Sequence, residues 1–145
     1  MTSPVALAHQ QHLPLHQRLL PLLAVGAARA LARLTPARLQ PVLELVRRGA
    51  RPATQQQAQT ARDAVVAVSL RCAGQHCLQR SLAAALHCRL HGTWPTWCTG
   101  VRVHPFTAHA WIQTDDQPIG EPFPAGHYHP LLTIPPTTTP HEPRR

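Results

Sequence analysis

Apolar residues recur at helical spacing through the first part of the chain. This period predicts four helices, which cover residues 15–34, 35–49, 61–74 and 77–90. Thr35 followed by Pro36 is a typical helix start, and Gly49 is a typical stop. The intervening residues 51–60 are polar, and we interpret them as a connector.

The third predicted helix carries one apolar stripe. Its members are spaced by four, three and four residues: Ala61, Val65, Val68 and Cys72. The stripe predicts that Cys72 packs in the core. The fourth helix has leucines at every fourth position and a closing glycine at Gly92.

After the fourth helix the pattern changes to alternation, which favours strands. The predicted strands cover residues 97–103, 108–113, 117–121 and 128–134. Helices followed by an antiparallel hairpin sheet predict an α+β domain. We expect one domain over residues 1–134, and a disordered tail over residues 135–145, where proline and threonine dominate.

All 14 basic residues are arginine, and the formal net charge is +8. The abundance of Ala, Pro and Arg indicates a GC-rich bacterial gene. Several of these arginines lie in about the first third of the chain without interleaved aromatic residues, among them Arg29, Arg33, Arg47, Arg48 and Arg51. We interpret them as a solvated helical face, with docking of an acidic partner as the second interpretation and nucleic-acid binding a distant third.

The four cysteines form no C-x-x-C pair, so free thiols are expected in place of a zinc site or a redox dithiol. The apolar stretch at residues 19–28 is interrupted by Pro21 and is shorter than the roughly 20 residues that span a bilayer. We predict a core helix in a cytoplasmic protein without a membrane span, and a signal sequence is the second interpretation. His9, His12 and His16 have helical spacing but no neighbouring carboxylate or thiol, so no metal or cofactor is predicted.

The candidate catalytic residues are centred on His109, which lies within a predicted strand of alternating pattern. Ala108, Ala110 and Ile112 would lie on one face, and His109 on the other. Its candidate partner is Cys77, at the first turn of a helix after a glycine-containing break, where free amides and the helix dipole favour a thiolate. A helix-start cysteine followed by a strand histidine and then an acid is the order of a Cys-His-acid site.

The acid is chosen by distance. Asp115 lies about 20 Å from His109 along a strand that rises roughly 3.3 Å per residue, and Asp116 has the same difficulty. Glu121 is the only carboxylate on the returning strand. Because a strict two-residue turn at Asp115–Asp116 would pair Glu121 with Ala110 and point it away from His109, we predict a three-residue loop or a bulge at Gly120.

Three motifs together resemble the transglutaminase-like leader peptidases of lasso peptide biosynthesis: C-L-Q-R-S-L at 77–82, G-V-R-V-H-P-F-T-A-H-A-W at 100–111 and P-I-G-E at 118–121. The resemblance covers residues 60–134 well and the N-terminal helices loosely. It implies a transglutaminase-like or papain-like cysteine protease core with Cys77 as nucleophile, His109 as general base and acid, and Glu121 where many members have aspartate. Asp116 also stands where glycine is common.

The resemblance further implies hydrolysis of one amide bond in a precursor peptide, without a cofactor. Main-chain amides around Cys77, together with Gln75, are expected to stabilise the oxyanion. Four residues are expected to line a peptide groove: Trp97, Arg102, Phe106 and Trp111. For each of these, core packing or a surface charge is an equally good interpretation.

The expected partners are the leader of the precursor, a separate leader-recognition protein, and an ATP-dependent macrolactam synthetase that closes the released core. The chain leaves no room for a fused recognition module. Two alternatives stay open: acyl transfer to an amine in place of water, and a non-catalytic scaffold that binds a peptide.

Overall fold

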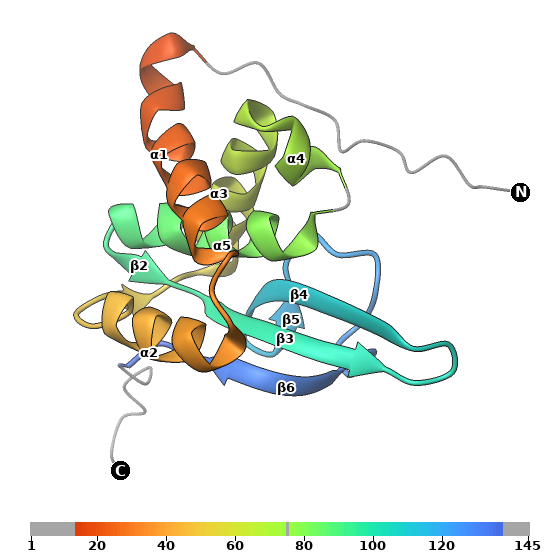
Figure 1. Cartoon of the computed structure of the whole chain (residues 1–145). Helices are drawn as coiled ribbons and strands as arrows, with labels where there is room; N and C mark the ends of the chain where they lie inside the picture. Colours follow the sequence, from red (N-terminus) through yellow and green to blue (C-terminus); the bar gives the residue numbers. More distant parts are fainter. Residues whose placement is uncertain (1–13, 75, 138–145) are drawn as a thin grey trace, which may run out of the picture.

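The computed structural model describes residues 14–74 and 76–137, which form a helical layer above a small antiparallel sheet (Figure 1). The α+β prediction is confirmed. The elements are α1 (Leu15–Leu31), α2 (Pro36–Val46), β1 (Arg51–Pro52), α3 (Gln55–Val68), α4 (Leu70–Ala73), α5 (Cys77–Leu90), β2 (Thr93–Trp94), β3 (Thr96–Arg102), β4 (Thr107–Thr114), β5 (Gln117–Pro118) and β6 (His129–Ile134).

Helix α5 is the centre of the helical layer. Helices α1 and α3 pack against it, and its other side contacts β4. The consecutive residues 81–85 are all buried, which is possible because three of them are alanines that let neighbouring elements approach closely. The predicted bounds of this helix are confirmed. This packing holds the start of α5, where Cys77 lies, against the sheet.

The third predicted helix was wrong at two points. Helix α3 begins at Gln55, inside the predicted connector, because Thr54 and Gln57 form a reciprocal capping box. The predicted helix over 61–74 is broken at Ser69, which has an extended backbone, and the Ser69 hydroxyl accepts a hydrogen bond from the Cys72 amide at 3.3 Å. Cys72 itself is fully buried in the core, as predicted.

The four-stranded sheet has the order β5-β4-β3-β6, with antiparallel neighbours. One face carries Trp97, Ile112 and Ile134, which are buried in the core beneath the helices. Trp97 donates its indole N–H to the Ser81 hydroxyl of α5 at 3.1 Å. His109 pairs with Gly100 and belongs to the opposite face, as the alternation predicts.

The basic helical face differs from the prediction at two positions, because Arg51 lies in β1 and Arg47 makes a structural contact. Arg47 is half-buried and donates a hydrogen bond to the carbonyl of Pro135 at 2.7 Å, which fastens the end of α2 to the chain after β6. Arg29, Arg33, Arg48 and Arg51 are exposed. Arg47 is therefore a structural contact, and the other four remain available to solvent.

The four cysteines are all described, and all are free thiols, as predicted. Within residues 14–74 and 76–137, no helix has the length and apolar character required to cross a bilayer. Residues 138–145 of the predicted tail lie outside the described part of the chain.

Candidate active site

Cys77 is the first residue of α5 and is half-buried. The break before it is fastened by Arg80, which donates one hydrogen bond to the carbonyl of Gly74 at 2.8 Å and a longer one to the carbonyl of Cys72 at 3.4 Å. Amides in the first turn of a helix have no acceptor within the helix, so the amide of Cys77 is available to a developing oxyanion. Gln75, the other predicted oxyanion residue, lies outside the described residues.

The edge of β4 supplies a backbone donor to the thiol of Cys77. β5 pairs only with Gln113 and Thr114, and beyond them the amide of Ile119 bonds to the carbonyl of Ile112 at 2.9 Å. Because backbone groups two residues apart point the same way in a strand, the Ala110 amide faces the same edge, where no strand of the described residues covers it. There it donates a hydrogen bond to the thiol of Cys77.

His109 and Glu121 come together at the third corner of the site. Nε2 of His109 lies 3.2 Å from Oε2 of Glu121, and the two side chains are 16% and 5% exposed. The His109 ring also hydrogen-bonds the Cys77 side chain. Since Glu121 occupies Nε2, Nδ1 is the ring nitrogen left to face the thiol.

Glu121 reaches His109 by a route that differs from the prediction. The turn at Asp115–Asp116 contains no extra residue, because Thr114 pairs directly with Gln117. Both aspartates have positive φ, 48° and 60°, as a two-residue hairpin of right-handed twist requires. The predicted three-residue loop was therefore wrong, whereas the other predicted position of the irregularity, Gly120, was right.

The chain leaves the sheet at Gly120 instead. β5 ends at Pro118, so the predicted strand over 117–121 was too long. Gly120 has φ +65°, and a Cβ there would lie 2.7 Å from Cδ of Arg62. Only glycine fits both the left-handed backbone and this close approach. The bend frees Glu121 from the register that would have turned it away from His109.

Arg80 links the acid to the nucleophile. Its guanidinium lies 3.8 Å from Oε1 of Glu121, while it also holds the carbonyls before Cys77. The two side chains are 12% and 5% exposed, so the ion pair is largely removed from solvent. Sequence reasoning did not identify Arg80 as part of the site. Its position one helical turn after Cys77 was the available signal.

The surroundings of the pair shift both pKa values toward a thiolate and an imidazolium. Burial by itself would raise the pKa of Cys77, but hydrogen bonds from His109 and the Ala110 amide, with the charges of His109 and Arg80, lower that pKa below its ordinary value. Burial by itself would lower the pKa of His109, but its hydrogen bonds and charge interactions with Cys77 and Glu121 raise it to about 9. The pair can therefore supply a nucleophile and a proton donor at neutral pH.

An aromatic cluster packs around the imidazole. The ring centroids of Trp111, Phe123 and Tyr128 lie 6.2, 5.3 and 5.2 Å from that of His109. Trp111 is 3% exposed and supports the histidine ring, and it borders a hollow of about 190 Å³ that does not include Cys77. Phe123 and Tyr128 were missed by sequence reasoning, because the loop after Gly120 has no period that would show which side chains turn inward.

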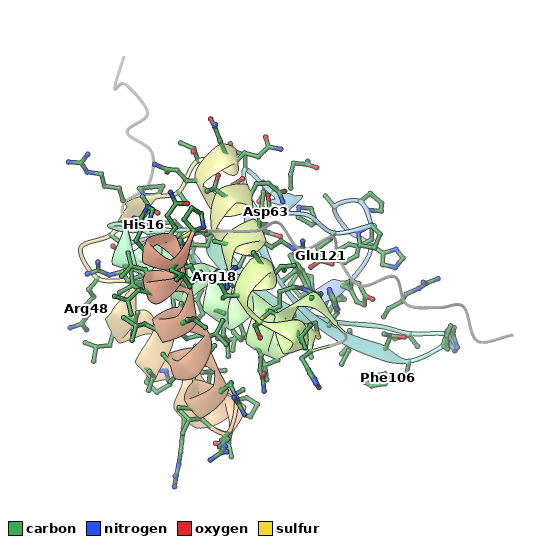
Figure 2. The ribbon with its side chains drawn as sticks, turned by 90° about the horizontal axis from the view of Figure 1, so that it is seen from above. His16, Arg18, Arg48, Asp63, Phe106 and Glu121 are labelled. Atoms are coloured by element: carbon green, nitrogen blue, oxygen red, sulfur yellow. The ribbon has the colours of Figure 1, made fainter. Side chains whose placement is uncertain are left out.

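The other predicted groove residues are scattered. Trp97 borders a cavity beside Cys77, whereas Arg102 is exposed and contacts Nε2 of His127 at 3.3 Å. Phe106 is 73% exposed near the end of the β3–β4 hairpin, and Figure 2 shows it well away from Glu121. The structure thus brings Cys77, His109 and Glu121 together with Trp97 close by, and leaves Arg102 and Phe106 outside.

No cluster of three or more metal-ligating side chains occurs among the described residues. His9 and His12 of the histidine series lie outside those residues, and His16 is exposed on α1 (Figure 2). The arrangement around Cys77 has the chemistry of covalent catalysis by a thiolate, oriented by an imidazole and a carboxylate.

Comparison with known families gave one match. The model of a family described as the transglutaminase-like superfamily matches residues 21–133, which is well over half of the chain and includes the whole site. Searches of curated proteins and of solved structures found no significant match.

Proposed function

Because the chain belongs to the transglutaminase-like superfamily, we propose that it is a cysteine peptidase, one that removes the leader from a ribosomally made lasso peptide precursor. The observation that carries the peptidase activity is the pairing of Cys77 with His109, whose Nε2 lies 3.2 Å from Glu121. The lasso peptide substrate rests on the resemblance of the three motifs around these residues.

The proposed reaction has two steps. The Cys77 thiolate attacks the scissile carbonyl while its first-turn amide stabilises the oxyanion, and His109 then gives its proton to the leaving amine. The resulting thioester is hydrolysed by a water molecule whose proton is taken by His109. Glu121 holds the imidazole in one orientation and stabilises its charged form.

The proposed partners follow from the same resemblance. A separate recognition protein would deliver the leader, and an ATP-dependent macrolactam synthetase would close the released core. Reaction in the bacterial cytoplasm suits this scheme, because Cys77 must remain reduced to act.

The test is product analysis by mass spectrometry. The chain, its recognition protein and a candidate precursor are incubated together, and the proposal expects two fragments whose summed mass exceeds that of the precursor by one water. Cys77→Ala should abolish cleavage, whereas Cys98→Ala, which removes a buried thiol of β3, should retain it. Unchanged cleavage by Cys77→Ala would overturn the proposal.

The same experiment separates the two other activities. An amine-dependent product, in which the acyl fragment gains the mass of an added amine in place of water, would indicate acyl transfer. Binding of the precursor without any product, in wild type and in Cys77→Ala alike, would indicate a scaffold. Either outcome replaces the peptidase.

A further inference from the structure

A cavity of about 600 Å³ opens beside Cys77 and His109. Its walls come from the start of α2, the start of α5, and the helix-facing side of β3, β4 and β6. The lining includes Cys77 and His109 but none of the three aromatic side chains that pack around the imidazole. A peptide whose scissile carbonyl lies at Cys77 therefore passes its mouth.

The lining is almost entirely apolar. It has no arginine, aspartate or glutamate, and outside the reactive pair its polar side chains are Gln40 and Thr99. The small residues Ala108 and Ala110 of β4 leave room beside His109. An acidic side chain that extends into the cavity beyond the reactive pair would lose its hydration without gaining a partner.

A β-bulge gives the cavity its rim. Thr99 pairs with Leu132 but Gly100 pairs with Pro130, so Leu131 is an extra residue in β6. Alternation would place neighbouring leucines on opposite faces, but with the bulge both Leu131 and Leu132 border the cavity. The carbonyl of His129 approaches so closely that a Cβ at Gly100 would lie 2.6 Å from it, which ties the bulge to that glycine.

Leu131 is 66% exposed although it borders the apolar cavity. An exposed leucine at the rim of an apolar cavity beside a nucleophile marks a surface that another apolar group covers. Because the cavity adjoins Cys77, we take this apolar group to belong to a bound substrate peptide. Residues one or two places from the scissile bond lie within roughly 7 Å of it in an extended chain.

We propose that this cavity is a specificity pocket that takes the large apolar side chain of a substrate residue one or two positions from the scissile amide. The inference rests on the proposed peptidase function and adds the substrate class: peptides with leucine, isoleucine, methionine or phenylalanine at that position. An acidic residue there is rejected.

Peptidyl chloromethyl ketones test the pocket without the natural precursor. The Cys77 thiolate displaces chloride from such a probe and forms a thioether, which is measured as a mass increase of the full-length chain. Probes carry leucine, glycine or aspartate at the first or the second residue from the ketone. At one of these two positions, leucine should react at least tenfold faster than glycine, and aspartate should be slower still.

Leu131→Asp links the preference to the cavity. This variant should reduce the leucine-to-glycine rate ratio at least fivefold, whereas Leu45→Asp, at a leucine that is 60% exposed on α2 outside the cavity, should keep the wild-type ratio. Ala37→Glu, at an exposed position of the cavity wall, gives a second measurement if Leu131→Asp folds poorly.

Iodoacetamide, which has no side chain to fill the pocket, reports on the nucleophile alone. If Cys77 reacts rapidly with iodoacetamide but all probes react at equal rates, or if Leu131→Asp keeps the wild-type ratio, the pocket is overturned and the peptidase stands. If Cys77 reacts with iodoacetamide no faster than the buried thiols, the peptidase itself is overturned, and the pocket with it.

Discussion

A cysteine and a histidine lie together at each end of α5, and the two pairs have opposite pKa shifts, although at the start of the helix the histidine comes from β4. At the start of α5, Cys77 has a lowered pKa, and the pKa of its partner His109 is raised to about 9. Near its end, burial raises the pKa of Cys88 to about 12, and burial together with the charge of His91 lowers the pKa of the adjacent His87 to about 4. The first pair favours two charges, and the second favours none.

The hydrogen-bond and charge partners of each pair cause these opposite pKa shifts. His109 has Glu121 on Nε2, and the thiol of Cys77 receives the amide of Ala110. His87, by contrast, has a buried Nδ1 without a hydrogen-bond partner in the described part of the chain, and its ring lies 4.7 Å from that of His91. A cysteine of this helix and a neighbouring histidine therefore become a reactive pair only where a carboxylate and a free amide face them.

The largest expected difference is in thiol reactivity. With a pKa of about 12, Cys88 is about 10⁻⁵ thiolate at pH 7, whereas a pKa below 9.0 makes Cys77 more than about 10⁻² thiolate. Iodoacetamide should therefore label Cys77 on the order of 10³-fold faster than Cys88, as read by peptide mass mapping over time. Cys77→Ala should remove the fast phase and Cys88→Ala should retain it. Labelling of both at one rate would contradict the contrast between the two ends.

The second-largest effect is expected from Glu121→Gln, which should reduce catalysis by Cys77 and His109. The amide cannot stabilise the imidazolium, so we expect kcat/KM for precursor cleavage to fall roughly 10²- to 10⁴-fold. The pKa of His109, about 9 in the native chain, should drop, because the Glu121 charge and hydrogen bond help to raise it. The alkaline limb of the pH profile then moves to lower pH, since imidazolium is needed to protonate the leaving amine.

Glu44→Gln is the control for this change, because Glu44 lies on α2 and only accepts a hydrogen bond from Gln40 at 3.1 Å. It should keep both the rate and the alkaline limb. An unshifted limb in Glu121→Gln would show that Glu121 does not set the charge of His109.

His87, near the unreactive end of α5, should lower the free energy of unfolding in acid. The folded pKa of His87 is about 4 against an ordinary 6.5, so the unfolded chain takes up a proton in this window that the folded chain does not. Stability is therefore lost as the pH falls from 6.5 to 4, by at most about 3 kcal/mol. His87→Leu should flatten this dependence in urea unfolding, whereas His16→Leu, at an exposed histidine, should not. Equal slopes in both variants would refute the assignment.

The parts of the fold and of the site that depend on local sequence signals could be predicted. The start of α5 at Cys77 follows from a glycine-containing break and a leucine period, and the β4 alternation places His109 on its face. The start of α3 was also readable, because Thr54 and Gln57 have the spacing of a capping box. That signal was outweighed by the polar composition of the segment.

The rest depends on contacts that no local pattern encodes. Alternation along a regular hairpin turns Glu121 away from His109, and only the left-handed backbone of Gly120 reverses this. A glycine is compatible with either sign of φ, so the bend is fixed by its packing against Arg62. The pairing of Arg80 with Glu121 likewise requires the helical layer to lie over the sheet.

The smallest expected effect comes from the arginines near the two ends of α5, Arg80 and Arg89. Both donate from α5 to backbone carbonyls: Arg80 to Gly74 at 2.8 Å, and Arg89 to Val46 at 2.8 Å. Only Arg80 also pairs with Glu121, and its charge helps to lower the pKa of Cys77. Arg80→Gln should therefore raise that pKa, move the acid limb of the pH profile upward and reduce kcat/KM about tenfold.

Arg80→Lys separates charge from geometry in this position. Lysine restores the positive charge but cannot present the planar fork that spans two partners, so the acid limb should return toward that of wild type while part of the rate loss remains. Arg89→Gln removes comparable backbone contacts at the inert end, so it should lower the free energy of unfolding without moving either limb. If Arg80→Gln changes only stability, as Arg89→Gln should, then Arg80 fastens the helix and does not position the reactive pair.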